Sequence, residues 1–368
     1  MSATLHIFNP GHDIALAANL ENFTPPKAAR DLQRRLGGLP ALWAQPGDVV
    51  LVDDAAFVDD GGLFDVRDGV SFPRNDVFFL TAKALAADVE QRRRIDRVEP
   101  WGWDRAVAGL LKRVHLSHLA PSDEWLQTIR LMSHRRFAAT RFLPFLTDAS
   151  WLSTAVSSAA EETGRCPSSS LLVGEATELS SPDAFTTEQM KKRFPKASAF
   201  VAKSPWSSTG RGVRFLQTPA DWQRQQAWAR RVIAQQGSVM LEPLYPRVMD
   251  FAMEFQHGRY CGLSLFDTRH GAYTGNRVAS EEAKMEVLTS YLPASLLQTV
   301  RMAIEYLAEK EILPFYKGPF GVDMMVVDSG CETQHPYQLH PCVELNLRRT
   351  MGHVALVSRP CESLHFGL

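Results

Sequence analysis

The segment that decides the fold runs from residue 200 to residue 213 and reads Phe200-Val-Ala-Lys203-Ser-Pro-Trp-Ser207-Ser208-Thr209-Gly210-Arg211-Gly212-Val213. An apolar strand ends in a lysine, and a loop of small residues follows. Gly210 and Gly212 let backbone N–H groups approach phosphate oxygens, the hydroxyl groups of residues 207–209 add donors, and Lys203 supplies a compact positive charge. The segment therefore predicts a phosphate-binding loop. A glycine-rich hairpin with a surface lysine is the alternative.

Two other nucleotide-binding patterns are missing from the sequence. A P-loop places its lysine after the glycines and directly before Ser or Thr, and the chain has no such order. The dinucleotide-binding pattern needs three spaced glycines after the first strand, but Asn9-Pro-Gly-His-Asp13 contains only one. An oxidoreductase that uses a dinucleotide is therefore disfavoured.

Three oxygen-bearing side chains lie on two predicted strands near the C-terminus. Asp323 lies within the apolar run 321–327, and Glu344 and Asn346 are two positions apart in the run 342–347. Alternation along a strand puts Glu344 and Asn346 on one face. Two carboxylates and an amide oxygen suit a Mg²⁺ ion that also bridges nucleotide phosphates. We therefore predict a metal site at Asp323, Glu344 and Asn346. Ordinary polar alternation on a solvated sheet face is the alternative.

Two arginines follow the predicted metal ligands directly. Arg348 and Arg349 are placed to hold a substrate carboxylate or to neutralise a phosphoryl group in transfer, and we predict them as catalytic residues. No convincing Ser-His-Asp or Cys-His nucleophile set accompanies them.

Two polar segments are candidates for substrate binding. The first is Asn9–Asp13, at the end of the first predicted strand, where α/β folds tend to bind ligands. The second is Tyr273–Arg277, which we predict to be a polar turn. Helix capping is the alternative for His12 and the favoured interpretation for Asp13. For Asn276 and Arg277, the alternative is a simple strand end.

The composition indicates a globular protein. The 368 residues are 45% hydrophobic and 22% charged, enough for two or three compact units. Forty basic against 41 acidic residues give a formal charge of −1, which favours neither nucleic acid nor an anionic membrane as partner. Five scattered cysteines without a CxxC pair argue against a disulfide framework or a structural zinc site. With no secretory or membrane-spanning apolar run, we expect a cytoplasmic protein.

The alternation of strand and helix patterns predicts an α/β (α+β) fold. We expect an N-terminal α/β domain at 1–100, linker helices with a glycine-loop subdomain at 101–240, and a metal-site subdomain at 241–368. The Ser/Thr-rich stretch 150–181 is a loop or insertion candidate. The expected strands are 5–8, 48–53, 76–80, 171–173, 199–203, 238–242, 250–255, 260–266, 321–327 and 338–346, and the main helices are 26–36, several within 103–146, 220–236 and 294–310.

The order of these parts resembles the ATP-grasp superfamily over roughly residues 100–355. That superfamily includes D-alanine ligase, glutathione synthetase and biotin carboxylase. The resemblance rests on the lysine strand with its mobile glycine-rich loop, on the strand Met240-Leu-Glu242-Pro-Leu-Tyr245 that ends in a hinge glutamate, and on the Asp323, Glu344, Asn346 set. Both the chemistry and the sequence order match.

The resemblance implies an ATP-grasp fold in which two α+β subdomains clamp ATP. It implies that Glu242 and the backbone near Leu244 face the nucleotide, and that Asp250 belongs to the same pocket, with a strand-end turn carboxylate as the alternative. Arg135, in Met132-Ser-His-Arg135-Arg136-Phe, stands where the family places a basic residue that reaches a nucleotide phosphate. Here His and Arg replace the common Asp-Lys pair, and an exposed helix arginine is the alternative.

The activity that the resemblance implies is ligation of a small-molecule carboxylate to an amine, with ATP and Mg²⁺. Lys203 would grip the α- and β-phosphates, the loop would close over the β- and γ-phosphates, and Arg348 or Arg349 would hold the acceptor carboxylate. A homodimer is a further expectation from the family. An ATP-grasp kinase that phosphorylates a hydroxyl, or a non-catalytic nucleotide-binding protein, are the alternatives. The retained lysine and metal set argue against the latter.

Overall fold

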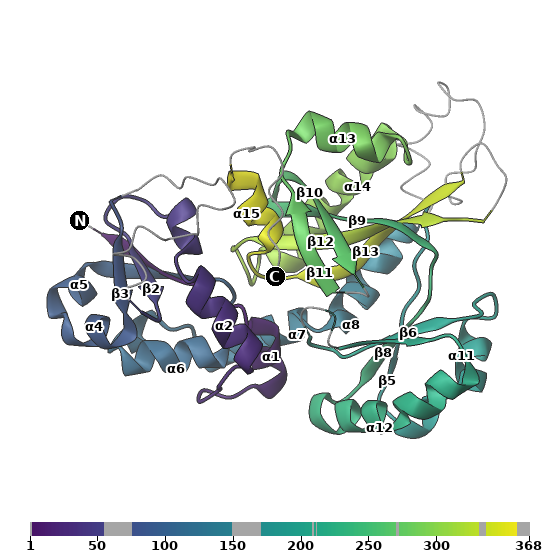
Figure 1. Ribbon diagram of the computed structural model, residues 1–368, viewed down its shortest axis with the longest axis horizontal. Helices are drawn as coiled ribbons and strands as arrows, with labels where there is room; N and C mark the ends of the chain where they lie inside the picture. Colours follow the sequence, from purple (N-terminus) through teal and green to yellow (C-terminus); the bar gives the residue numbers. More distant parts are fainter. Residues whose placement is uncertain are drawn as a thin grey trace.

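The computed structural model describes residues 2–54, 76–148, 171–207, 210, 212–269, 272–330 and 336–358. In this part of the chain the strands form three sheets, which we name the N-terminal, middle and C-terminal sheets (Figure 1). Parallel and antiparallel pairings are both present, so the predicted α/β (α+β) class is confirmed. None of the described helices combines the length and the apolar character that a membrane crossing needs.

The N-terminal sheet is parallel and has the order β3-β2-β1-β4. Its core is apolar because alternate strand residues such as Leu5 and Val49 pack on Val107 and Leu111 of a following helix. The strands are β1 (Ala3–Ile7), β2 (Val49–Val52), β3 (Phe78–Thr81) and β4 (Ile95–Pro100), and the helices of this region are α1 (His12–Ala18), α2 (Lys27–Leu36), α4 (Ala82–Ala87), α5 (Val89–Arg94) and α6 (Arg105–Arg113).

The middle sheet carries the lysine strand. It is antiparallel, with the order β5-β8-β6-β7, and α12 packs on one face through Trp222, Trp228 and Val232. A capping box at Thr218 and a left-handed Gly237 define the ends of α12. The elements are β5 (Thr177–Leu179), α11 (Thr187–Arg193), β6 (Phe200–Lys203), β7 (Val213–Leu216), α12 (Pro219–Gln236) and β8 (Val239–Pro243).

The C-terminal sheet holds the predicted metal ligands and is antiparallel, with the order β11-β10-β9-β12-β13. Helices before and within this region share one apolar core with it, in which Phe255 and Phe320 stack at a centroid distance of 4.9 Å. The elements are α7 (Asp123–Met132), α8 (Arg135–Phe137), α9 (Leu143–Thr147), β9 (Arg247–Gln256), β10 (Arg259–Arg269), β11 (Ala272–Arg277), α13 (Glu281–Thr289), α14 (Ala294–Leu307), β12 (Phe320–Asp328), β13 (Tyr337–Asn346) and α15 (Met351–Val357).

Three local predictions were wrong. The segment predicted as a polar turn at 273–277 is β11, the edge strand of the C-terminal sheet. The apolar run 171–173 makes only an isolated bridge between Leu172 and Leu339 rather than a strand. The helix expected to reach residue 310 ends at Leu307 and continues as a π-helical turn over Ala308–Ile312. Most of the Ser/Thr-rich stretch, residues 149–170, lies outside the described residues. The domain boundaries at 100 and 240 stay predictions.

One charged contact joins the first helix to the end of β13. Asp13 lies in the first turn of α1, but Gly11 is the N-cap and no side chain caps this helix, so the favoured capping role for Asp13 was wrong. Its carboxylate instead accepts hydrogen bonds from Arg348, at 2.8 Å from Nη2 and 3.2 Å from Nε. Both side chains are mostly buried, with 17% and 16% of their surface exposed. The pair therefore links the N-terminal region to the C-terminal sheet.

We expect Asp13→Asn to lower the free energy of unfolding by about 3 kcal/mol, because it leaves the Arg348 guanidinium buried without its counter-charge. Asp31→Asn is the matched control, since Asp31 forms an exposed pair with Arg34 at 3.5 Å and its loss should cost under about 0.5 kcal/mol. Urea unfolding of the two variants measures the difference. An equal shift in both would contradict the linking role of Asp13.

The same pair predicts a pH dependence. Burial alone would raise the pKa of Asp13, but Arg348 and His12 outweigh burial and lower it. The ionised carboxylate therefore adds stability above its unfolded pKa of about 3.9 and loses it as the pH falls through the lower, folded value. The stability difference between the native protein and Asp13→Asn should shrink below about pH 4. A stability difference that stays constant down to pH 2 would argue against a lowered pKa of Asp13 in the folded protein.

Candidate functional site

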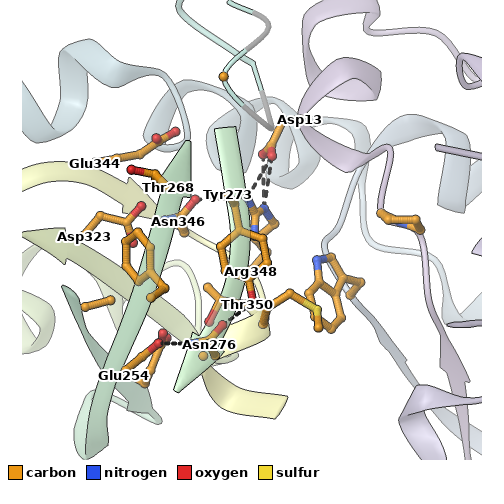
Figure 2. Close-up of a pocket in the computed structure, with 18 of the residues that line it drawn as sticks. Asp13, Glu254, Thr268, Tyr273, Asn276, Asp323, Glu344, Asn346, Arg348 and Thr350 are labelled. Carbon is orange, nitrogen blue, oxygen red and sulfur yellow. Dashed lines mark hydrogen bonds and ion pairs between the residues drawn. The ribbon is translucent and has the colours of Figure 1, made fainter. Parts of the chain in front are cut away.

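A cavity of about 240 Å³ lies where the N-terminal region, the glycine-rich loop and the C-terminal sheet meet. Many of its polar side chains come from β9, β10, β11, β12 and β13, and Figure 2 shows several of them pointing toward one another. The lining includes residues from segments far apart in the sequence: Pro10, Asp13, Arg135, Ser207, Gly210, Glu254, Ser264, Thr268, Tyr273, Asn276, Asp323, Glu344, Asn346, Arg348, Thr350 and Gly352.

The three predicted metal ligands come together on this wall. Asp323 of β12 is directly opposite Glu344 of β13 in the strand register, and Asn346 lies two residues further on. Burial raises the pKa of Asp323 well above its usual range, and the neighbouring Glu344 and Glu254 raise it further. Two adjacent carboxylates that repel one another fit a divalent cation, which would neutralise both.

The third ligand of this set has to be an amide oxygen. Among the described residues, no group of three His, Cys, Asp or Glu side chains has the arrangement of a metal site. Asn346 is the predicted source of a further oxygen, and its Oδ1 accepts a hydrogen bond from Arg348 at 3.0 Å. The amide oxygen has two lone pairs, so this bond leaves one for a cation.

Two of the three predicted arginines reach the cavity. Arg135 forms an ion pair with Glu344 at 2.8 Å and also donates to the Ser204 carbonyl at 3.1 Å. Arg348 is held by Asp13 and Asn346. Arg349 lies elsewhere: its guanidinium stacks on Trp43 at 4.2 Å from the ring centroid, and it does not line the cavity. The guanidinium groups at the site are thus Arg135 and Arg348.

The glycine-rich loop folds back on itself beside Arg135. The Ser204 N–H donates to the Gly212 carbonyl at 2.8 Å, and Gly210 has a left-handed backbone, with φ of 71°. A side chain at Gly212 would collide with Ser207, so this position needs glycine. Ser207 and Gly210 line the cavity, whereas the predicted Ser208 and Thr209 lie outside the described residues.

Lys203 and Glu242 lie behind this loop, on β6 and β8. The lysine Nζ is 2.5 Å from a Glu242 oxygen, and Lys203 is 7% exposed. The pair is close enough to His340 of β13 to influence its ionisation: burial lowers the pKa of His340 to about 4, and Lys203 lowers it further whereas Glu242 raises it. The two predicted nucleotide residues are therefore in contact, between the middle and C-terminal sheets.

The two remaining residues predicted to contact the nucleotide, Leu244 and Asp250, form hydrogen bonds within the protein. The N–H of Leu244 donates to the Ala199 carbonyl at 2.9 Å, so this donor is already used. Asp250 accepts hydrogen bonds from Arg247 and from the Thr268 hydroxyl, each at 2.7 Å. Thr268 lines the cavity, but Asp250 does not. Contact of Leu244 and Asp250 with a nucleotide stays a prediction.

Sequence reasoning left out part of the site. Glu254 is buried in the apolar strand β9, and it lines the cavity. The sequence feature that could have identified Glu254 is the one used for Asp323, a single acidic residue within an apolar run. The two candidate substrate segments contribute Pro10 and Asp13 from the first, and Tyr273 and Asn276 from the second.

Comparison with known proteins indicates the fold. No protein-family model matches the sequence, and no curated protein does. A solved biotin carboxylase from Campylobacter jejuni, in a complex described as beta-gamma-ATP, has 14% identity and a TM-score of 0.51, over 97% of this chain and 67% of that one.

Two further solved structures are similar at lower TM-scores. D-cycloserine synthetase DcsG has 13% identity and a TM-score of 0.46, with 96% of this chain and 97% of that chain covered. D-alanine–D-alanine ligase from Bacillus anthracis, complexed with ATP, has 11% identity and a TM-score of 0.46, with coverages of 94% and 86%. By its similarity to the biotin carboxylase, a member of that superfamily, this chain has the ATP-grasp fold.

Proposed function

We propose that the chain is an ATP-dependent ligase that joins a small-molecule carboxylate to an amine through an acyl phosphate. The observation that carries this proposal is the pair of adjacent carboxylates, Asp323 and Glu344, in one cavity with two guanidinium groups. That arrangement suits Mg²⁺ and the charge of a transferring phosphoryl group. The ATP-grasp fold supports it, since the solved structure at a TM-score of 0.51 is a biotin carboxylase in a beta-gamma-ATP complex.

The reaction would proceed in two steps, phosphoryl transfer and then amide formation. A substrate carboxylate oxygen attacks the γ-phosphorus of ATP, so an acyl phosphate forms and ADP leaves. The amine nitrogen then attacks the acyl carbon, the bond from that carbon to the phosphate oxygen breaks, and the nitrogen loses a proton. Products are the amide, ADP and phosphate. The protein's part is to hold the reactants in place and balance their charges.

Each residue has a place in this scheme. Asp323, Glu344 and Asn346 would hold Mg²⁺, which would neutralise charge on the phosphate oxygens. Lys203 and Arg135 contact phosphates, and the loop from Ser207 to Gly212 covers them. Arg348, fixed by Asp13, keeps its charge beside the metal ligands and positions Asn346. Exclusion of water by the loop protects the acyl phosphate from hydrolysis.

The alternative is a kinase of the same fold that phosphorylates a hydroxyl. The purified chain should be incubated with Mg-ATP and pooled amino acids and small carboxylic acids, with ADP, phosphate and product masses recorded. A ligase releases phosphate and yields a condensed, dehydrated product. A product that retains phosphate would favour the kinase, and the absence of ATP binding would exclude both.

We predict that Asp323→Asn and Glu344→Gln each lower turnover at least 100-fold, because each removes a carboxylate that balances the metal charge. Asp328→Asn is the control, since it makes the same change at the exposed end of the same strand. ADP release is measured after circular dichroism has established that each variant is folded. Normal ADP release by a folded Asp323→Asn protein would refute the metal assignment.

We also predict that Lys203→Ala weakens binding of a non-hydrolysable Mg-ATP analogue at least tenfold, because it removes a charge from the phosphate region. Lys191→Ala, an exposed lysine on α11, is the control. Since Lys203→Ala leaves Glu242 without its ion pair, the double variant Lys203→Met with Glu242→Gln is measured in parallel. Calorimetric affinities equal to that of the native protein in both variants would rule out a role for Lys203 in nucleotide binding.

A further inference from the structure

Glu254 occupies an unusual position in the middle of the C-terminal sheet. It lies on β9 with 1% of its surface exposed, opposite Gly321 of β12 and Gly262 of β10. A carboxylate in the interior of a sheet is costly unless it has a partner. Figure 2 shows Glu254 beside Asn276, with Asp323 lying between it and Glu344 in this view.

Glycines make the space around this carboxylate. A Cβ atom at Gly352 of α15 would collide with one Glu254 oxygen, and one at Gly321 would lie 2.5 Å from the other. Gly352 also lines the cavity. The absence of a Cβ at these two positions therefore leaves the room that the carboxylate itself occupies at the wall of the cavity.

Glu254 Oε2 has no hydrogen-bond partner among the described residues. The nearest basic atom is Nδ1 of His353, at 3.0 Å. That imidazole is already engaged, with Nε2 3.0 Å from the Phe255 carbonyl and Nδ1 3.2 Å from the N–H of Thr350. With Nδ1 accepting from the Thr350 N–H, its approach to Glu254 makes no hydrogen bond, and Oε2 is left without a hydrogen-bond partner among the described residues.

A row of neutral polar groups borders the carboxylate. The Tyr273 hydroxyl donates to the Asn276 side-chain oxygen, and the Asn276 amide donates to the Ser264 hydroxyl at 2.5 Å. Burial, and after it the charge of Glu254, raises the pKa of Tyr273, so this hydroxyl stays protonated. The row adds acceptor oxygens at Tyr273 and Ser264 but no positive charge.

The charges of the cavity leave Glu254 unbalanced. Among the described residues, the lining contains four carboxylates, from Asp13, Glu254, Asp323 and Glu344, and two guanidinium groups. Arg348 pairs with Asp13, and Arg135 pairs with Glu344. The cation proposed at Asp323 and Glu344 accounts for a third carboxylate, and Glu254 remains without a counter-charge.

We propose that Glu254 binds the ammonium group of the amine substrate. This inference rests on the proposed ligase only for the statement that an amine is the second substrate. An ammonium group offers three N–H donors, which Glu254, Ser264 and Tyr273 can accept. It also supplies the positive charge that the buried carboxylate lacks. The substrate class is thus a small primary amine that enters the cavity in its charged form.

The test is calorimetric titration of the full chain with glycinamide, a small primary ammonium compound, and with acetamide, its neutral analogue. The native protein should bind glycinamide and not acetamide. Glu254→Gln should weaken glycinamide binding at least tenfold, because a charge-assisted hydrogen bond becomes a neutral one. Glu286→Gln, which makes the same charge change at an exposed position of α13, should leave it unaltered.

The midpoint of thermal unfolding separates binding from structure. If Glu254 has no partner in the free protein, Glu254→Gln should unfold at the same temperature as the native protein or a higher one. A lower midpoint would indicate a structural ion pair with His353 and overturn the proposal. So would equal binding of glycinamide and acetamide, no binding of glycinamide by the native protein, or unaltered binding by Glu254→Gln.

Turnover distinguishes this inference from the proposed function. Binding of glycinamide that depends on Glu254, in a protein that consumes no ATP with any pooled substrate, would refute the ligase and leave the ammonium site standing. If the pooled screen identifies the amine, Glu254→Gln should raise its KM at least tenfold while the KM for ATP stays within about twofold. A normal KM for that amine would overturn the inference and leave the ligase intact.

Discussion

The buried guanidinium of Arg348 is the constraint on which the rest of the site depends. Its donors reach Asp13 on α1, the Asn346 oxygen on β13 and the Arg349 carbonyl. A guanidinium in this position cannot lose its proton, so it requires the Asp13 carboxylate, which only the N-terminal region supplies. The C-terminal sheet alone would therefore leave this guanidinium without the carboxylate to which it is hydrogen-bonded. The N-terminal sheet is part of the site for this electrostatic reason.

The second constraint is the placement of Arg135 between the loop and the metal ligands. Its guanidinium contacts Glu344, the Ser204 carbonyl and the Ser207 hydroxyl. A cation at Glu344 and phosphates under the loop would both compete for these contacts, since the arginine pairs equally well with phosphate oxygens. Nucleotide binding and loop position are thus coupled through one side chain. If Arg135 turned to a phosphate, Glu344 would be released for the proposed metal.

The sequence predicted the site residues that can be identified from the residue pattern of a single strand. Lys203 ends an apolar strand, and Glu344 and Asn346 alternate on another, so their positions followed from periodicity. Asp13 and Arg348 are 335 positions apart in the sequence, so no local residue pattern predicts their contact. The strands β4 and β11 were missed as strands. The charged residues of β4 are exposed and β11 is polar, so neither shows the apolar pattern by which the other edge strand of the C-terminal sheet, β13, was predicted.

The unpaired carboxylate at Glu254 bears on the choice between ligase and kinase. A folded chain retains a costly buried charge where a function requires it, and the glycines at 321 and 352 leave room for this one at the wall of the cavity. A hydroxyl acceptor is neutral and would leave the charge unbalanced. An ammonium acceptor would balance it, and its deprotonation during attack on the acyl carbon would occur beside a carboxylate able to accept the proton. The charge distribution of the cavity therefore favours an amine as second substrate.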